Sequence, residues 1–570
     1  MHRWIITAFW ILVLGTTAPA AAEDPLLTLT RLFAPDPQAA KADDEPPFFE
    51  CGVELTALVS ENWHRMSPAL RSNIPQRYRP ETFRDPDRGA DELDDICDRF
   101  LDSEHFRVHY STQPEHQPPG YPDLQTVRDL ASHLETAYAY HRDVSGMGVA
   151  LTDGDAGGGV DLIDCYFLLL EEVWGYAERL AAAPGYCADA IWGRMAVSTD
   201  FDAYDFGEQL RLTSEHEYFH LLQYAYGARN SWFMESTARN SEFHVWPAIA
   251  NPRGALAWMS APYRPVWDAT GFHRYAPHFW MYLEVNHGRD VVTRTWQSSC
   301  DRWVVDVIAD RMTERGTDLA AVLTDFAIWN YFTGWRDDGR HYDPAFNLPA
   351  VYYQGKVTAY PLPAARLPAA AIARPAGSNY LRFEGPASRN NLRLTVDGHP
   401  DLAGRRAVVV LGVDARGHRA WILEPDADGD VDFVVPDWGI YDHVALVVTN
   451  FREAPDDSVL LTYTFAAEEV ALGAAASSLA RVVTAAPNPF VGSTRIVCFA
   501  PRDGEISTVR IYDTAGRLVR TLLDTPVYAG RHELVWDGTD SGGRRVATGM
   551  YLVRLRNGTQ EHARKVMFVR

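Results

Sequence analysis

Residues 207–227 of the chain read GEQLRLTSEHEYFHLLQYAYG. Apolar residues recur along this stretch at helical spacing, and Gly227 is well placed to end a helix, so we expect one helix here. Side chains at positions i and i+4 of a helix lie on one face, about 6 Å apart. His216 and His220 can therefore offer one ring nitrogen each to the same metal ion.

Glu217 follows the first histidine and lies about 100° further round the helix. This offset keeps its carboxylate out of direct coordination but near enough to take a proton from a water molecule that the metal activates. The pattern His-Glu-x-x-His with this division of labour is typical of zinc hydrolases. The motif predicts zinc (Zn2+) as the cofactor, His216 and His220 as ligands, and Glu217 as the general base.

A catalytic zinc ion needs a third protein ligand and one open position. Residues 228–231 are expected to turn the chain, and a second helix is expected from about residue 232 to residue 245, before a proline. This helix would bring Glu235 toward the two histidines, and Glu235 is the predicted third ligand. Two interpretations stay open for Glu242 on the same face: a hydrogen bond that holds a ligand, or a solvated charge.

The pentapeptide alone also arises by chance in unrelated chains. Its helical placement, the glycine after it and a glutamate on the next predicted helix are independent requirements of a zinc site, and the chain meets all three. We therefore interpret His216, His220 and Glu235 as metal ligands.

At these residues the sequence resembles the gluzincin metallopeptidases, in which HExxH supplies two ligands and a glutamate on the next helix supplies the third. Its resemblance to a group of secreted bacterial metallopeptidases is closer than that to the aminopeptidase branch, through HEYFHLLQYAYG (216–227), WFMESTA (232–238) and WNYFTG (329–334). The resemblance extends over roughly residues 105–345 and implies an α+β zincin-like metallopeptidase domain there.

The chain departs from the aminopeptidase branch of that family in three ways. It carries Ser236 where that branch has glycine, it has a shorter gap between His220 and Glu235, and it lacks a GxMEN-type signature. Aminopeptidase specificity is therefore not implied.

The sequence between residues 105 and 201 is consistent with an α+β domain. It predicts a strand over HFRVHYS (105–111), a helix over residues 124–140, and a strand with its following loop over residues 161–176. The segment RMAVSTDF (194–201) is either an edge strand that holds the substrate backbone or an ordinary strand.

Transition-state stabilisation in such sites needs a hydrogen-bond donor aimed at the developing oxyanion. Tyr275, within GFHRYAPHFWMYLEVNHG (271–288), occupies roughly the position at which the gluzincin resemblance places a catalytic tyrosine. His273 and His278 compete with Tyr275 for that role. The alternative is that Tyr275 simply packs in a core helix.

The N-terminus predicts export. Residues 1–22 combine an arginine, a short apolar run and small residues, as a signal peptide does, with cleavage expected after Ala22. No later segment approaches the roughly 18 uncharged apolar residues of a membrane span. The net charge of -23 offers no basic stripe for phosphate neutralisation, which argues against a nucleic-acid partner. We expect a secreted, extracellular protein.

Residues 23–104 are rich in Pro, Asp and Arg and are interpreted as an N-terminal extension or pro-segment. The charge run PETFRDPDRGADELDD (80–95) fits a solvated surface. A propeptide that covers the zinc until secretion is the second interpretation.

An oxidising compartment permits the six cysteines to pair. The pairs expected from proximity in sequence are Cys51 with Cys97 and Cys165 with Cys187. Cys498 is remote from the others and is expected to be a buried apolar residue.

After about residue 346 the sequence changes to short alternating runs separated by turns, which favours an all-β sandwich over residues 346–470. A low-complexity linker is expected over residues 471–483. A second all-β module is expected over residues 484–570.

This last module carries the elements PNPF (487–490), YDTAGR (512–517) and WDG (536–538). Together they resemble the Ig-like domain related to the flagellar hook-capping protein, often described as a type IX secretion sorting domain. The resemblance implies export across the outer membrane, release or attachment at the cell surface, and the secretion machinery as a partner. A generic Ig-like spacer is the alternative.

The sequence thus predicts a multidomain chain with an α+β zincin-like metallopeptidase domain followed by two all-β modules, one a sandwich and one Ig-like. The predicted function is that of a secreted zinc metallopeptidase acting on a protein or peptide substrate. One alternative is a zinc hydrolase of a non-peptide amide or ester, which would share every ligand. The other is a catalytically inactive, surface-anchored binding protein, against which the intact Glu217 weighs.

Overall fold

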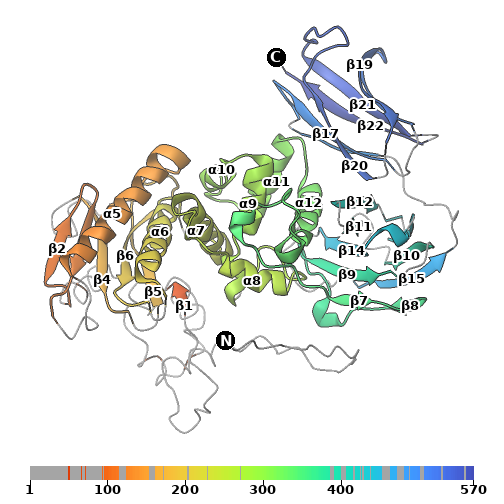
Figure 1. The fold of residues 1–570 in the computed structure, drawn as a ribbon. Helices are drawn as coiled ribbons and strands as arrows, with labels where there is room; N and C mark the ends of the chain where they lie inside the picture. The colour runs from red at the N-terminus through yellow and green to blue at the C-terminus, as the bar shows by residue number, and fades with distance from the viewer. Residues whose placement is uncertain are drawn as a thin grey trace.

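The structure, a computed structural model, describes residues 97–569 with short gaps, the longest being 114–122, 153–160, 452–461 and 471–480. Before residue 97 it describes residues 49–51 and the single positions 66, 71, 93 and 96. The predicted signal peptide and most of the predicted pro-segment therefore lie outside the described residues. Figure 1 shows a sheet with helices at one end, a helical layer in the middle and two β-modules at the other end.

A mixed six-stranded sheet forms the N-terminal layer, with the strand order β1-β5-β6-β4-β3-β2. Its strands are β1 (Phe49–Cys51), β2 (Arg99–Asp102), β3 (Phe106–Tyr110), β4 (Ile163–Leu168), β5 (Val173–Ala182) and β6 (Ile191–Ser198). β3 and β4 are parallel, and helix α5 (Leu124–Tyr140) connects them. All six residues of β4 are buried, as expected for an interior strand covered on both faces.

Most of the local predictions for this layer are confirmed. The helix expected over residues 124–140 is α5, and the strand expected over residues 105–111 contains β3. Residues 161–176 hold β4 and the start of β5 rather than one strand with its loop, because each apolar run there forms its own strand. The segment 194–201 falls largely in β6, which lies between β5 and β4, so the suggestion that it is a substrate-holding edge is wrong.

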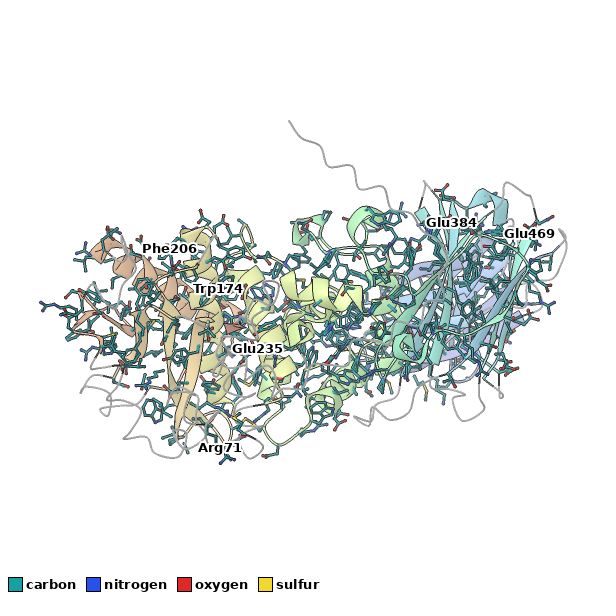
Figure 2. The ribbon with its side chains drawn as sticks, turned by 90° about the horizontal axis from the view of Figure 1, so that it is seen from below. Arg71, Trp174, Phe206, Glu235, Glu384 and Glu469 are labelled. Carbon is teal, nitrogen blue, oxygen red and sulfur yellow. A yellow bond between two sulfur atoms is a disulfide. The ribbon has the colours of Figure 1, made fainter. Side chains whose placement is uncertain are left out.

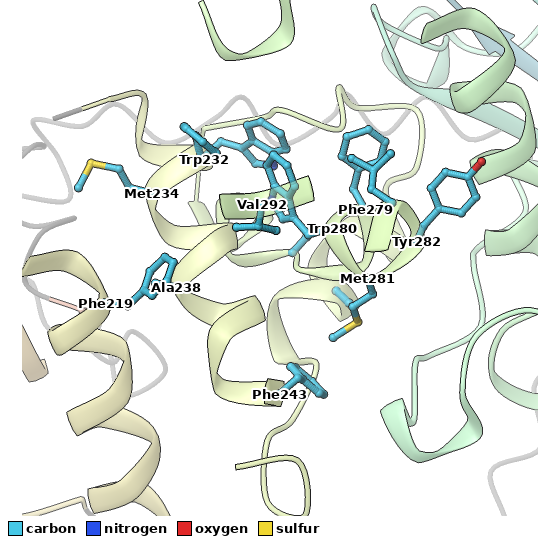
Figure 3. Close-up of a cluster of buried hydrophobic side chains, with 14 of the residues drawn as sticks. Phe219, Trp232, Met234, Ala238, Phe243, Phe279, Trp280, Met281, Tyr282 and Val292 are labelled. Atoms are coloured by element: carbon cyan, nitrogen blue, oxygen red, sulfur yellow. The ribbon is translucent and has the colours of Figure 1, made fainter. Parts of the chain in front are cut away.

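Two helices, α6 (Phe206–Ala225) and α7 (Ser231–Val245), connect the sheet to the helical layer. That layer consists of α8 (Arg253–Ser260), α9 (His278–His287), α10 (Val291–Gln297), α11 (Val304–Glu314) and α12 (Leu319–Tyr331). The rings of Trp232 on α7 and Trp280 on α9 stack with centroids 5.4 Å apart, and Figure 3 shows Phe219 of α6 beside Ala238 of α7. Within the described part of the chain, no helix has the length and apolar character needed to cross a membrane.

A β-sandwich follows, built from the sheets β13-β10-β15-β8 and β12-β11-β14-β9-β7. Its strands are β7 (Gly355–Val357), β8 (Leu362–Ala365), β9 (Ser378–Glu384), β10 (Asn391–Asp397), β11 (Arg406–Asp414), β12 (Gly417–Leu423), β13 (Val431–Val435), β14 (His443–Asn450) and β15 (Thr464–Val470). The prediction of an all-β module after residue 346 is confirmed.

The five-stranded sheet of this sandwich is buried on both faces. On β11, Val408 and Val410 belong to the core between the two sheets, whereas Val409 and Leu411 pack with the helical layer. The hydroxyl of Tyr380 on β9 donates to a carbonyl of α12 over 2.9 Å. Figure 1 shows α12 lying next to β11 and β14. The sandwich therefore shares a core with the helical layer and is not a detached spacer.

The C-terminal module has two sheets, β16-β17-β20 and β19-β18-β21-β22. Its strands are β16 (Arg481–Ala486), β17 (Thr494–Ala500), β18 (Ile506–Asp513), β19 (Leu518–Pro526), β20 (Gly530–Trp536), β21 (Gly549–Asn557) and β22 (Gln560–Phe568). Its core is separate and includes Phe490, Trp536 and Phe568. The expected linker over residues 471–483 lies mostly outside the described residues, and β16 begins slightly before the predicted boundary at residue 484.

One disulfide joins Cys187 to Cys300, which are 113 residues apart in sequence. The predicted Cys165–Cys187 pair is wrong, because Cys165 is buried in the interior strand β4 while Cys187 lies in the loop after β5. The pair predicted for Cys51 concerns a side chain outside the described residues. Cys498 is buried, as predicted.

We expect a chain that ends at residue 345 to be insoluble or unfolded. It would lose the sandwich side chains that pack on the helical layer, which are Tyr380, Val409, Leu411, Ala445 and Val447. The four larger side chains of this set contribute about 1.5–3 kcal/mol each when buried, so their sum is comparable with the roughly 5–15 kcal/mol that stabilises a domain.

The control is a chain that ends at residue 475, which keeps this shared core and should keep the Tm of the full chain. Both are compared by solubility and by circular-dichroism melting. A soluble chain of residues 23–345 with an unchanged Tm would contradict the shared core.

Candidate metal centre

Capping residues set the ends of the two helices that carry the site. Asp205 accepts a hydrogen bond from the N–H of Glu208 over 2.9 Å at the start of α6, and Asn230 accepts one from the N–H of Trp232 over 2.9 Å at the start of α7. Gly227 between them has a φ of 82°, a left-handed conformation that glycine adopts without strain. These residues produce a short reversal, so α7 runs back along α6.

The turn between α6 and α7 is anchored to two other loops. Arg229 donates to Asp189 in the loop after β5 over 2.8 Å, and to the carbonyl of Ser299 over 2.9 Å. The disulfide between Cys187 and Cys300 joins the same two loops. The spacing between the helices is therefore held from outside the site.

The three predicted ligands, His216, His220 and Glu235, lie together, with their ligand atoms all within 4.8 Å of one another. Oε2 of Glu235 is 3.2 Å from Nε2 of His216 and 3.5 Å from Nε2 of His220. Two ligands that are each about 2.0–2.1 Å from a tetrahedral zinc ion lie about 3.4 Å apart, so the donor set and its spacing fit zinc. Figure 2 shows Glu235 between the N-terminal sheet and the helical layer.

Gln223 sets the orientation of His220. Its Nε2 donates to the carbonyl of Met234 over 2.9 Å and to the hydroxyl of Thr237 over 3.0 Å. The amide oxygen of Gln223 therefore faces Nδ1 of His220, at 2.7 Å, and Nδ1 must carry the hydrogen. Nε2 of His220 is directed toward Glu235 and is the ring nitrogen available to a metal ion.

Glu242 holds the other histidine. Its Oε1 lies 2.9 Å from Nδ1 of His216, and its Oε2 accepts from Arg239 over 3.0 Å. Glu242 is only 1% exposed, so its interpretation as a solvated charge is wrong, and it positions His216 as the first interpretation stated. Arg239 is not among the residues predicted from the sequence, although it lies one turn after Glu235 on the same helix face.

The buried charges at this site act strongly on one another. Burial disfavours a charge on His216, but its hydrogen bonds to Glu235 and Glu242 outweigh that effect and raise the pKa of His216 to about 10. Burial also disfavours a charge on Glu235, yet His220 and His216 lower the pKa of Glu235 to about 2. The Glu235 carboxylate is therefore ionised at neutral pH, and a metal ion at this place competes with the proton on His216.

Glu217 adjoins the ligands without belonging to their cluster. It is fully buried and, with His216, Arg239 and Trp174, it lines a cavity of about 20 Å³, which has room for about one water molecule. Strand β5 passes directly over it, since a Cβ added at Gly175 would lie 2.7 Å from Cγ of Glu217. The predicted base therefore lies beside both a predicted ligand and a space for water.

Tyr275 lies beside the site as well. It ends the 3-10 helix η6 (Gly271–Tyr275), is buried, and has its ring centroid 6.4 Å from that of His216. Of its two competitors, His273 is half-buried in η6. His278 packs against aromatic side chains of α8 and α12, where burial lowers its pKa to about 3. Of the three candidates, Tyr275 is the one whose described contacts include a predicted metal ligand.

Comparison with known families identifies only the C-terminal module. Residues 496–561 match the FlgD Ig-like domain. The matched range runs from within β17 into β22 and falls inside the module predicted for residues 484–570. Comparison with curated proteins gives no match.

Several solved structures share weak similarity with parts of the chain. Dimeric latent PorU from Porphyromonas gingivalis is 18% identical over 39% of this chain and 19% of its own, with a TM-score of 0.17. PorZ, a surface component of the type IX secretion system of that bacterium, is 18% identical over 29% of this chain and 23% of its own, with a TM-score of 0.13. A β-galacturonidase from Eisenbergiella tayi is 13% identical over 34% and 35%, with a TM-score of 0.14. The chain spans well under two thirds of each, and such TM-scores support no argument about this protein.

Glu242→Ala is expected to weaken zinc binding by about 10- to 100-fold, because the acceptor that orients His216 is lost. Glu242→Gln should cost less, since its amide oxygen can still accept from Nδ1. Competition with a chromophoric chelator measures both affinities. Gln223→Leu tests the same principle at His220. Zinc affinity equal to that of the wild type in both Glu242→Ala and Gln223→Leu would contradict these positioning roles.

Proposed function

We propose that the protein is a secreted zinc-dependent metallopeptidase, and that its N-terminal sheet and helical layer form a zincin-like peptidase domain. The observation that carries the proposal is the convergence of His216, His220 and Glu235, with the ring nitrogens directed at one carboxylate oxygen and with Glu217 beside them. Two imidazoles and one carboxylate, with a fourth position left open, form a donor set typical of catalytic zinc. Oε1 of Glu235 is buried and has no hydrogen-bond partner among the described residues, which also favours an ion at this place.

Zinc held by these residues would act as a Lewis acid, polarising the scissile carbonyl and lowering the pKa of a water molecule. Glu217 takes the proton of the attacking water, for which the adjoining cavity has room, and delivers it to the leaving amine. The backbone of β5 at Gly175 limits the movement of the Glu217 side chain. Tyr275 is the candidate donor to the oxyanion of the transition state.

We infer that the C-terminal module serves export and surface display through the secretion machinery. The inference is supported by the match of residues 496–561 to the FlgD Ig-like domain and by the sequence elements of the sorting domains that this module resembles. Its separate hydrophobic core is consistent with a role that is independent of the metal site.

Glu217→Gln is expected to lower casein cleavage by about 10²- to 10⁴-fold while the protein still binds about one zinc per chain, because the general base is lost but the ligands remain. Metal content is measured by mass spectrometry and cleavage by release of labelled fragments, on chains without residues 1–22. Glu208→Gln, in the exposed first turn of the same helix, is the matched control and should behave as the wild type.

Each result other than the expected one is informative. Absence of zinc from the wild type would refute the metal centre. Bound zinc without cleavage of any peptide would refute the peptidase. If the wild type then hydrolyses an ester or a non-peptide amide and Glu217→Gln does not, the alternative hydrolase takes its place. Equal activity of wild type and Glu217→Gln would remove Glu217 from the mechanism.

A further inference from the structure

The segment WNYFTG (329–334) takes no part in the candidate metal centre, and in the structure it builds a fixed turn at the end of α12. The hydroxyl of Thr333 donates to the carbonyl of Asn330 over 2.8 Å and accepts from the N–H of Val351 over 3.3 Å. Gly334 has a φ of 60°, and a Cβ added there would lie 2.4 Å from the backbone of the segment before β7. The turn is therefore tied to the chain that leads into the sandwich.

This turn presents Trp335 to solvent. The residue belongs to the 3-10 helix η7 (Gly334–Arg336) and is 68% exposed, whereas the other described tryptophans are buried or half-buried. Its neighbour Arg336 is buried and donates to the carbonyls of Tyr331 over 2.7 Å and Val351 over 2.6 Å, which fixes the backbone below the ring. A single exposed aromatic ring is common on protein surfaces, so the surroundings of Trp335 decide what it can do.

Charged side chains adjoin the Trp335 ring. The guanidinium carbons of Arg336 and Arg382 lie 4.9 Å and 5.6 Å from the centroid of the ring. Lys356 on β7 is the register partner of Arg382 on β9. Glu384 joins these two cations, since its Oε1 is 2.9 Å from Nζ of Lys356 and 3.1 Å from Nε of Arg382. The side chains of Lys356 and Glu384 are 56% and 32% exposed, so a ligand on the ring can reach them.

We call Trp335, Arg382, Lys356 and Glu384 the Trp335 platform. It combines a flat apolar face with donors and an acceptor. Arg has five N–H donors and Lys has three, so both cations keep donors beyond the one that faces Glu384. A row of phosphates or of acidic side chains offers acceptors alone, and the Glu384 carboxylate would repel it. A sugar has a flat C–H face that can lie on an indole ring, and its hydroxyl groups can both donate and accept. A saccharide therefore matches the platform better than a nucleic acid or an acidic peptide does.

The charge of the region distinguishes acidic from neutral saccharides. Three cations, Arg336, Arg382 and Lys356, and one anion, Glu384, contact the ring or pair beside it. The whole chain carries a net charge of -23, so this region would attract an anionic ligand that most of the surface repels.

From this arrangement we propose that the Trp335 platform binds polysaccharides that carry carboxylate groups. A pyranose ring lies on Trp335, its carboxylate accepts from Arg382 and Lys356, and Glu384 accepts from a hydroxyl group. The platform lies where the helical layer meets the sandwich, because Trp335 follows α12 and the charged residues belong to β7 and β9. The site does not depend on the proposed peptidase function, and it would hold the protein on a matrix of acidic polysaccharide.

The test measures binding of an alginate oligosaccharide to chains without residues 1–22 by calorimetry, with a maltooligosaccharide of the same length as the neutral ligand. Trp335→Ala should weaken alginate binding by about 10-fold, because the stacking ring is lost, and Trp335→Phe should weaken it less. Arg382→Gln should also weaken it by about 10-fold, because charge-assisted hydrogen bonds are lost. Phe100→Ala is the matched control and should bind as the wild type does, since Phe100 is 57% exposed and has the guanidinium carbon of Arg107 4.2 Å from its ring centroid.

Two further measurements make the result specific. Trp335→Ala and Arg382→Gln should keep the Tm, the zinc content and the casein cleavage of the wild type, which shows that only the platform has changed. A wild type that does not bind alginate, or that binds a polyglutamate peptide or an oligothymidylate more tightly, would overturn the proposal. Equal affinity of the wild type and Trp335→Ala for alginate would overturn it as well, and so would equal affinity of the wild type for the alginate oligosaccharide and the maltooligosaccharide.

Discussion

The fold depends on charged side chains that are buried in one helix hairpin. Four glutamates of α6 and α7 are at most 1% exposed, and these are Glu215, Glu217, Glu235 and Glu242. Leaving a buried carboxylate without a counter-charge costs several kcal/mol. Glu215 has His141 at 2.7 Å, and Glu242 has Arg239 at 3.0 Å. Among the described residues, Glu235 faces the two histidines, and a bound dication would take the place of their positive charge and couple folding to metal binding.

The hairpin of α6 and α7 is enclosed on both sides. The sheet covers α6 on one side, and the aromatic layer around Trp232 and Trp280 covers α7 on the other. Burial strengthens the electrostatic interactions among the side chains of the hairpin, and each interaction depends on the distance between its two groups. The ligands must therefore keep their spacing. Because the ligands lie on both sides of the turn near Gly227, that spacing depends on the turn. The contacts of Arg229 and the disulfide after β5 anchor it from outside.

Much of the site could be predicted because it depends on helix geometry. The i, i+4 histidines and a glutamate on the returning helix follow from spacing, and the structure brings His216, His220 and Glu235 together. Gln223 and the Cys187–Cys300 pair could not be predicted in this way, because they depend on tertiary contacts between segments whose approach no local pattern encodes. The shared core did leave a signal: AVVVL (407–411) is continuously apolar rather than alternating, as strands buried on both faces are.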